Sequence, residues 1–276
     1  MSFTSQRGNQ KWFFVCEVKS MRRLYLLENE EQHAQAIVSP IGGQVISFVK
    51  DGKEVIYFQR IIGTKRRGGI PICFPFFGPP KPRFAGEHQH GWLRDQELDL
   101  YREITPPIQV IFKGVREKMG ADLVKRERYY PWSLEYWVAT DLISRSSLGL
   151  TLRVRRMEDQ IEEDAPINPA FHPYFSNLGR RAVKIGGKET ENFSKDAKIV
   201  PLNGQKELLI DLGQKVNMTL KGDFGNKSCV TLWSDSDEYF CVEPSLTHPD
   251  DFDTTKGEYL KQGETLTLGC ILSVLP

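Results

Sequence analysis

The chain has 276 residues, of which 39% are hydrophobic, and this is enough for one large domain with a sizeable core. Its 37 lysines and arginines are balanced by 36 aspartates and glutamates, so no basic field favours a nucleic-acid partner. No stretch approaches the ~20 apolar residues of a membrane span, and the N-terminus lacks a signal-peptide core.

These features predict a cytoplasmic protein with no membrane partner, and we expect it to be a monomer. No Gly/Ser linker or charge block interrupts the chain. We therefore expect one domain over residues 1–276, in which residues 1–10 form a loose N-terminal segment.

Two hairpins are the clearest elements of the first half. Gln44–Phe58 holds two β-rich runs separated by Asp51-Gly52, and glycine tolerates the positive φ of a type I′ turn. Residues 134–142 alternate between apolar and polar side chains, and residues 148–155 do the same. The short connection at residues 144–147 indicates that these two strands pair.

The second half predicts further short strands and almost no helix. The candidates are Val216–Leu220, Val230–Trp233, Tyr239–Val242 and Thr265–Leu272. The chain is punctuated by 23 glycines and 16 prolines. This pattern favours an all-β fold, a large antiparallel sandwich. The loops Pro79–Gly86 and Asn177–Gly187 are expected to cover a binding face.

Cysteine and histidine spacing does not predict a metal site. The five cysteines are far apart and form no Cys-x-x-Cys pair: Cys16, Cys73, Cys229, Cys241 and Cys270. They are expected to be reduced, buried thiols. His88 and His90 could share one face of an extended segment and bind zinc, but no third ligand follows at metal spacing.

Two residues stand out as candidates for proton transfer. His172 lies among aromatic residues in Asn168–Phe175, where a partly desolvated imidazole could exchange a proton at neutral pH. Glu243 closes the apolar run from Tyr239, and Pro244, which lacks an N–H, is expected to end that strand. Desolvation would raise the pKa of this carboxyl toward the range of a general base. A core histidine and a solvent-facing strand-end acid are the plain alternatives.

The stretch from Arg66 to Arg94 gathers cations, glycines and aromatic residues. Guanidinium groups bind phosphate in a bidentate manner. We therefore expect this stretch to form the floor and one wall of a sugar pocket that tolerates anions, although a solvated basic loop would show the same composition. Its aromatic residues could offer apolar faces to a sugar ring; they are Phe74, Phe76, Phe77 and Trp92.

Four motifs in this order carry a family resemblance. They are Arg67–Gly78, Gln89–Arg94, Phe171–Phe175 and Cys241–Pro244. Together they resemble the aldose 1-epimerase (galactose mutarotase-like) superfamily, and within it the glucose-6-phosphate 1-epimerases. The resemblance extends from about Ala36 to the C-terminus. Trp92-Leu93 and Pro173 depart from the residues expected at those places.

The resemblance implies a β-supersandwich, no cofactor, and interconversion of the α and β anomers of a hexose 6-phosphate. It implies His172 as general acid and Glu243 as general base. The substrate-binding residues that it implies are Arg67, Gln89, His90, Arg94 and Asp211.

Three other functions fit the same residues. A free-aldose 1-epimerase would use the arginines only to shape the pocket. A non-catalytic carbohydrate-binding domain would need no acid–base pair. A glycoside hydrolase would need two opposed carboxylates, for which Asp211 is the available partner of Glu243.

Overall fold

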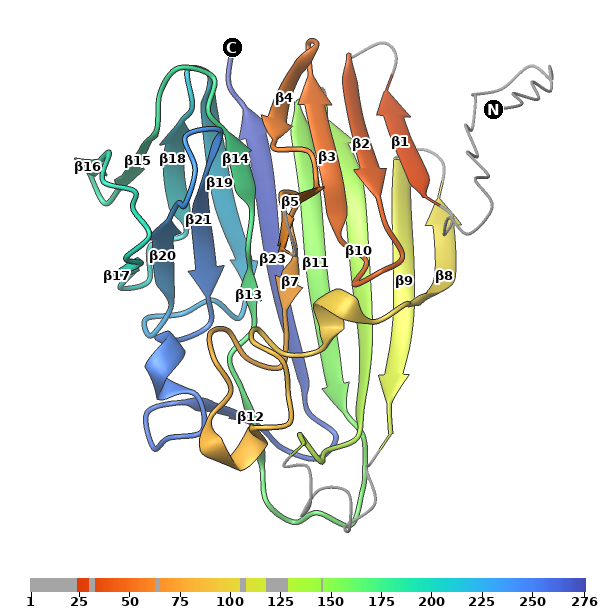
Figure 1. Cartoon of the computed structure of the whole chain (residues 1–276). Coiled ribbons are helices and arrows are strands. Elements are labelled where there is room, and N and C mark those ends of the chain that lie inside the picture. Colours follow the sequence, from red (N-terminus) through yellow and green to blue (C-terminus); the bar gives the residue numbers. More distant parts are fainter. Residues whose placement is uncertain (1–23, 30–32, 63–64, 105–107, 118–128, 145) are drawn as a thin grey trace, which may run out of the picture.

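The computed structural model describes residues 24–29, 33–62, 65–104, 108–117, 129–144 and 146–276. Two large antiparallel sheets make up most of this part of the chain (Figure 1). The predicted all-β antiparallel sandwich is therefore confirmed. Cys16 and residues 1–10 lie outside the described residues.

One sheet contains nine described strands. In spatial order they are β16 (Lys188–Thr190), β15 (Ala182–Ile185), β18 (Glu207–Asp211), β19 (Lys215–Gly222), β23 (Thr265–Val274), β11 (Ser147–Arg156), β10 (Leu134–Ser144), β9 (Ile108–Arg116) and β8 (Asp99–Ile104). Buried and more exposed residues alternate along β10, because successive side chains of a strand point to opposite faces. Leu134, Tyr136 and Val138 thus enter the core.

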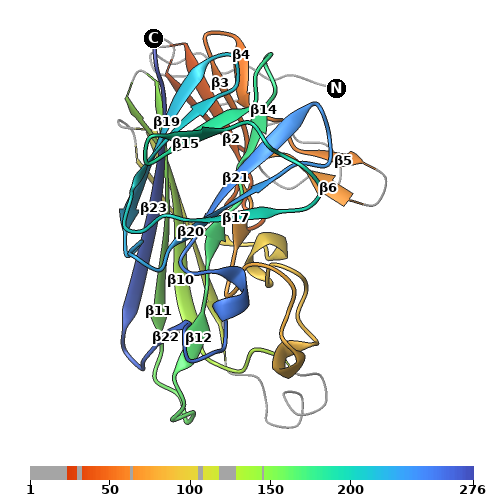
Figure 2. The ribbon, with the colours of Figure 1, turned by 90° about the vertical axis from the view of Figure 1, so that its left-hand side faces the viewer.

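The other sheet contains ten described strands. Eight follow one path: β1 (Tyr25–Asn29), β2 (Ala34–Val38), β3 (Val45–Lys50), β4 (Lys53–Ile56), β14 (Tyr174–Ser176), β21 (Tyr239–Ser245), β13 (Ala170–Phe171) and β7 (Ile72–Cys73). The remaining two are β20 (Cys229–Trp233), which pairs with β21, and β17 (Lys198–Pro201), which pairs with β20. Figure 2 shows the two sheets from the side.

Several short elements lie outside the two large sheets. They are the strand pairs β5 (Arg60–Ile62) with β6 (Lys65–Arg67) and β12 (Ala165–Ile167) with β22 (Glu258–Leu260), and the 3-10 turns η2 (Pro82–Phe84), η3 (Leu93–Asp95) and η4 (Pro249–Asp251). Within the described residues, no helix is long and apolar enough to cross a membrane.

Both predicted hairpins are confirmed. β3 pairs with β4 across Asp51 and Gly52, whose φ angles are 50° and 74°, as a type I′ turn requires. β10 pairs with β11 from Leu134↔Arg156 to Ser144↔Ser147. The four later strand candidates correspond to β19, β20, β21 and β23.

The predicted end of the strand at Pro244 is wrong. β21 continues to Ser245, and Pro244 pairs with Val230 of β20. On its other side β21 meets two separate strands, β14 as far as Cys241 and β13 at Ser245. No described strand pairs with β21 across this break, so a residue without an N–H is tolerated there.

One of the two predicted binding-face loops is also wrong. Asn177–Gly187 contains β15, which pairs with β18 in the nine-stranded sheet because Ala182, Val183 and Ile185 are apolar and buried. Pro79–Gly86 is irregular apart from η2, where the buried Phe84 packs against Trp132. The four described cysteines are buried and free, as expected.

Gly91→Ala is expected to lower the free energy of unfolding by about 3 kcal/mol. Gly91 has a φ of +71°, and a Cβ there would overlap the carbonyl oxygen of Phe74. Gly52→Ala is the matched control, because Gly52 has a φ of +74° with nothing within 4 Å of the added Cβ. Urea unfolding should show a loss of only about 1 kcal/mol for the control. Equal losses in the two variants would contradict the steric explanation.

Candidate active site

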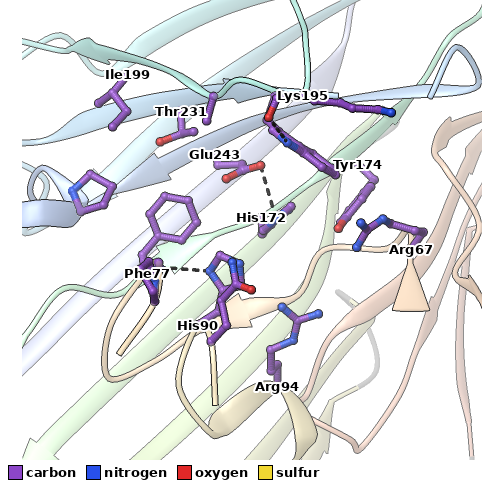
Figure 3. Close-up of a pocket in the computed structure, with 16 residues that line it drawn as sticks. Arg67, Phe77, His90, Arg94, His172, Tyr174, Lys195, Ile199, Thr231 and Glu243 are labelled. Atoms are coloured by element: carbon purple, nitrogen blue, oxygen red, sulfur yellow. Dashed lines mark hydrogen bonds and ion pairs between the residues drawn. The ribbon is translucent and has the colours of Figure 1, made fainter. Parts of the chain in front are cut away.

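A cavity of about 600 Å³ opens beside β21. Six of the seven residues predicted for the site line it: Arg67, Gln89, His90, Arg94, His172 and Glu243. They come from three separate parts of the chain and meet beside the ten-stranded sheet, on which Glu243 lies (Figure 3).

His172 and Glu243 meet at the break in the sheet. His172 occupies the gap between β13 and β14, directly beside the part of β21 that neither strand pairs with. Its Nε2 atom lies 3.3 Å from Oε1 of Glu243 (Figure 3). Both side chains are buried, which excludes a strand-end acid facing solvent.

Burial acts on the two groups in opposite directions. It lowers the pKa of His172 well below its usual value, with further lowering by His90 and Arg94. It raises the pKa of Glu243 to about 8, although Cys241 and Arg94 oppose this rise. Near neutral pH the pair therefore holds one proton, and burial favours the form in which Glu243 carries it.

A stacking contact holds the imidazole of His172 in place, while polar atoms of the His172–Glu243 pair lack hydrogen-bond partners. The ring of His172 stacks on Tyr174, with centroids 4.7 Å apart and planes inclined by 11°. Among the described residues, His172 Nδ1 has no hydrogen-bond partner, and Glu243 Oε1 lies 3.3 Å from His172 Nε2 without the angles of a hydrogen bond. Unsatisfied buried polar atoms are costly, so these two atoms are available to form hydrogen bonds with a bound molecule.

His90 faces the cavity as a neutral hydrogen-bond donor. Burial, with Arg94 and Arg67, lowers the pKa of His90 to about 3. Its Nδ1 accepts a hydrogen bond of 3.1 Å from the backbone N–H of Gly78, so the imidazole proton is on Nε2. The ring also stacks on Phe77, with centroids 5.2 Å apart. His88 is 78% exposed and near Asp95, so it does not share a site with His90.

Two arginines supply positive charge in different ways. Arg67 places Nη2 2.7 Å from Oδ2 of Asp235 and its guanidinium carbon 5.1 Å from the centre of the Trp233 ring. Arg94 is half-buried, and no carboxylate of the described residues lies within ion-pair distance of it. Arg94 is thus the better placed of the two to meet a new anion.

Asp211, the seventh residue predicted for the site, does not line the cavity. It ends β18 in the nine-stranded sheet, where Oδ2 accepts a hydrogen bond of 3.0 Å from Arg180 and Oδ1 one from the N–H of Gly213. An acid at the turn into β19 caps that turn instead of reaching the other sheet. Its expected sugar contact is not supported by this position.

One of the four aromatic residues that could offer a face to a sugar ring lines the cavity. Phe77 lines the cavity, whereas Phe74 and Phe76 are fully buried and Trp92 packs against Tyr136. Residues that the sequence did not single out line it as well; they are Tyr174, Lys195, Thr231 and Trp233 among others.

Some of these lining residues could have been predicted from the sequence. Thr231 lies opposite Glu243 in the β20–β21 pair, and Trp233 lies opposite Cys241. Pairing the two predicted strands would have placed both residues beside Glu243. Lys195 follows β16 in a polar segment with no strand pattern, so no local signal marks it.

His172, Cys241 and Glu243 also form the described group most similar to a metal site. Each offers one ligand atom, and these atoms lie within 4.8 Å of one another. Burial raises the pKa of the Cys241 thiol well above its usual value, so the thiol is protonated in the metal-free protein. Cys241 and Glu243 are two residues apart on β21, which explains why their side chains share a face.

Solved structures of several bacterial proteins share this fold. The Slr1438 protein from Synechocystis sp. PCC 6803 aligns with a TM-score of 0.72 at 20% identity, covering 95% of this chain and 99% of that one. A galactose mutarotase related enzyme from Lactobacillus acidophilus aligns with a TM-score of 0.69 at 18% identity, covering 92% and 97%. At these identities the likeness shows the galactose mutarotase-like fold alone.

Sequence comparison is more specific. A curated sequence from Cenchrus ciliaris, named "Putative glucose-6-phosphate 1-epimerase", is 27% identical over 212 residues, which are 74% of this chain. The match spans 56% of the length of that relative. The family model described as aldose 1-epimerase matches residues 23–250, which include His172 and Glu243. The chain therefore belongs to the aldose 1-epimerase family.

Proposed function

We propose that the protein interconverts the α and β anomers of a hexose 6-phosphate, with glucose 6-phosphate as the first candidate. The observation that carries this proposal is the buried His172–Glu243 pair, 3.3 Å apart, in the wall of a cavity that also contains Arg67 and Arg94. The cavity of about 600 Å³ is of the size that encloses small ligands.

The reaction requires only proton transfers. Movement of the shared proton from Glu243 to His172 gives an imidazolium and a carboxylate, without changing the net charge of the pair. His172 then protonates the ring oxygen of the sugar while Glu243 removes the proton from the C1 hydroxyl, and the ring opens to the aldehyde. Rotation about C1–C2 and reclosure with the roles reversed give the other anomer.

Two observations support a phosphorylated sugar. Arg94 and Arg67 both line the cavity, and guanidinium groups match the geometry of phosphate oxygens. The Cenchrus ciliaris relative is named for glucose 6-phosphate. Neutral His90, with its proton on Nε2, would donate to a sugar oxygen.

The other candidate functions lose support. Glu243 is the sole carboxylate among the described residues that line the cavity, so the second acid of a glycoside hydrolase is missing from that lining. A binding domain would not need an acid–base pair held 3.3 Å apart and away from water.

The direct test is NMR exchange between anomers of glucose 6-phosphate, other hexose 6-phosphates and the free sugars. We expect faster exchange for at least one phosphate than for its free sugar. Catalysis of free glucose or galactose alone would show a free-aldose 1-epimerase instead. Absence of exchange with every sugar, while the sugars still bind, would show a binding domain.

Arg94→Ala is expected to raise KM for glucose 6-phosphate by about 30-fold, because a charge-assisted hydrogen bond of about 2 kcal/mol is lost. KM for free glucose should change much less. Arg94 also lowers the pKa of Glu243, so the alkaline limb of the pH profile should move upward in this variant. Arg155→Ala, which removes an exposed arginine of β11 outside the cavity lining, is the control. Equal effects on both sugars would argue against a phosphate contact.

A further inference from the structure

Lys195 is an exposed cation in the cavity wall that none of the four sequence motifs includes. It lies between β16 and β17, and Ala197 of the same segment and Ile199 of β17 also line the cavity. Its backbone carbonyl accepts a hydrogen bond of 3.2 Å from Nε1 of Trp233 on β20. This bond fixes the main chain at Lys195 to the sheet, while the ammonium group remains free to move.

Trp233 connects Lys195 with Arg67. The indole N–H of Trp233 binds the Lys195 carbonyl, and its ring lies against the Arg67 guanidinium, 5.1 Å from centroid to carbon. Figure 3 shows the side chain of Lys195 extending toward the side of the cavity where Arg67 lies. The main chain of Lys195 and the guanidinium of Arg67, which come from segments more than a hundred residues apart, thus both contact Trp233.

The charges of the cavity do not balance without a ligand. Asp235 takes up the charge of Arg67 through the contact of 2.7 Å, and it also accepts a hydrogen bond from the hydroxyl of Tyr239. Arg94 and Lys195 have no carboxylate of the described residues within ion-pair distance. Two unbalanced positive charges match a phosphate monoester, which carries a charge of about −1.5 to −2 at pH 7.

We propose that Lys195 binds the phosphate group of the substrate at the edge of the cavity, with Arg67 and Arg94, and thereby selects phosphorylated over free hexoses. This inference rests on the proposed function. Arg67 contributes N–H donors in a fixed plane, whereas Lys195 contributes a mobile point charge. A mobile ammonium interacts similarly with the bound substrate and the transition state, so its effect falls on KM more than on kcat.

The test compares Lys195→Ala with Lys195→Arg. We expect Lys195→Ala to raise KM for glucose 6-phosphate by about tenfold with kcat within about twofold, and Lys195→Arg to recover most of this loss. The inhibition constant of inorganic phosphate should rise in parallel. Lys198→Ala is the matched control, because Lys198 is an exposed lysine three residues further on that does not line the cavity.

The possible outcomes separate this inference from the proposed function. If the unaltered protein prefers glucose 6-phosphate but Lys195→Ala leaves its KM unchanged, the role of Lys195 is refuted and the function stands. An equal rise of KM for glucose and glucose 6-phosphate also refutes a phosphate contact. If the unaltered protein shows no preference for phosphorylated sugars, the proposed function itself fails.

Discussion

Glu243→Gln is expected to lower kcat for anomerisation by about 10³-fold, within the range of a positioned general base. The amide has the shape of the carboxyl but cannot take the proton of the C1 hydroxyl. Glu243 lies against His172 at 3.3 Å and is almost fully buried, so solvent cannot replace it as a base. Anomer exchange measured by NMR at saturating substrate gives the effect directly.

Substrate binding should survive this change. Trp233 lines the cavity, so its fluorescence should report binding of glucose 6-phosphate to the variant. Glu238→Gln is the control, because Glu238 directly precedes β21 but binds the hydroxyl of Tyr57 outside the cavity lining. A Glu243→Gln protein with near-normal exchange would refute Glu243 as the base.

His172→Gln is expected to lower kcat by about 10²–10³-fold, because water must then protonate the ring oxygen. The double variant with Glu243→Gln should be little slower than the slower single variant, since the two groups act as one unit. His88→Gln, at an exposed histidine, should leave the rate unchanged. Additive losses in the double variant would show that the two residues act in separate steps.

The pH profile provides a second measurement on the same pair. In the proposed mechanism, the active form of the pair is the one that holds one proton. Burial raises the pKa of Glu243 to about 8, so kcat/KM should fall as the pH rises above 8 and the pair loses that proton. Burial lowers the pKa of His172 well below its usual value, so the acid limb should lie below pH 6.5. In Glu243→Gln the limb near 8 should disappear.

Sequence patterns correctly predicted the features that depend on residues close together in the chain. Alternation along β10 and β11 predicted their pairing, and Asp51-Gly52 predicted the type I′ turn. His172 and Glu243 stood out because an imidazole and a carboxyl occurred inside apolar runs. Their separation of 3.3 Å was not predictable, because it depends on the break between β13 and β14, which is a property of the assembled sheet.

Long-range placement explains the features that sequence patterns could not locate. Asp211 has a carboxylate that could bind a sugar. Its strand, β18, pairs in the nine-stranded sheet, and Asp211 does not line the cavity. Phe74 and Phe76 belong to a motif of the site, yet both side chains are buried in the core. Lys195 lies in a polar segment that resembles any surface loop, and only the contact with Trp233 brings it to the cavity.

The break in the ten-stranded sheet has a consequence for how substrate preference can change. His172 and Glu243 are positioned by neighbouring strands that pair through their backbones on both sides of the break. Lys195 and Gln89 lie on irregular segments at the edge of the cavity. Related proteins could therefore acquire new sugar substrates through changes in these segments, while the proton-transfer geometry stays the same. Efforts to redesign selectivity would best begin there.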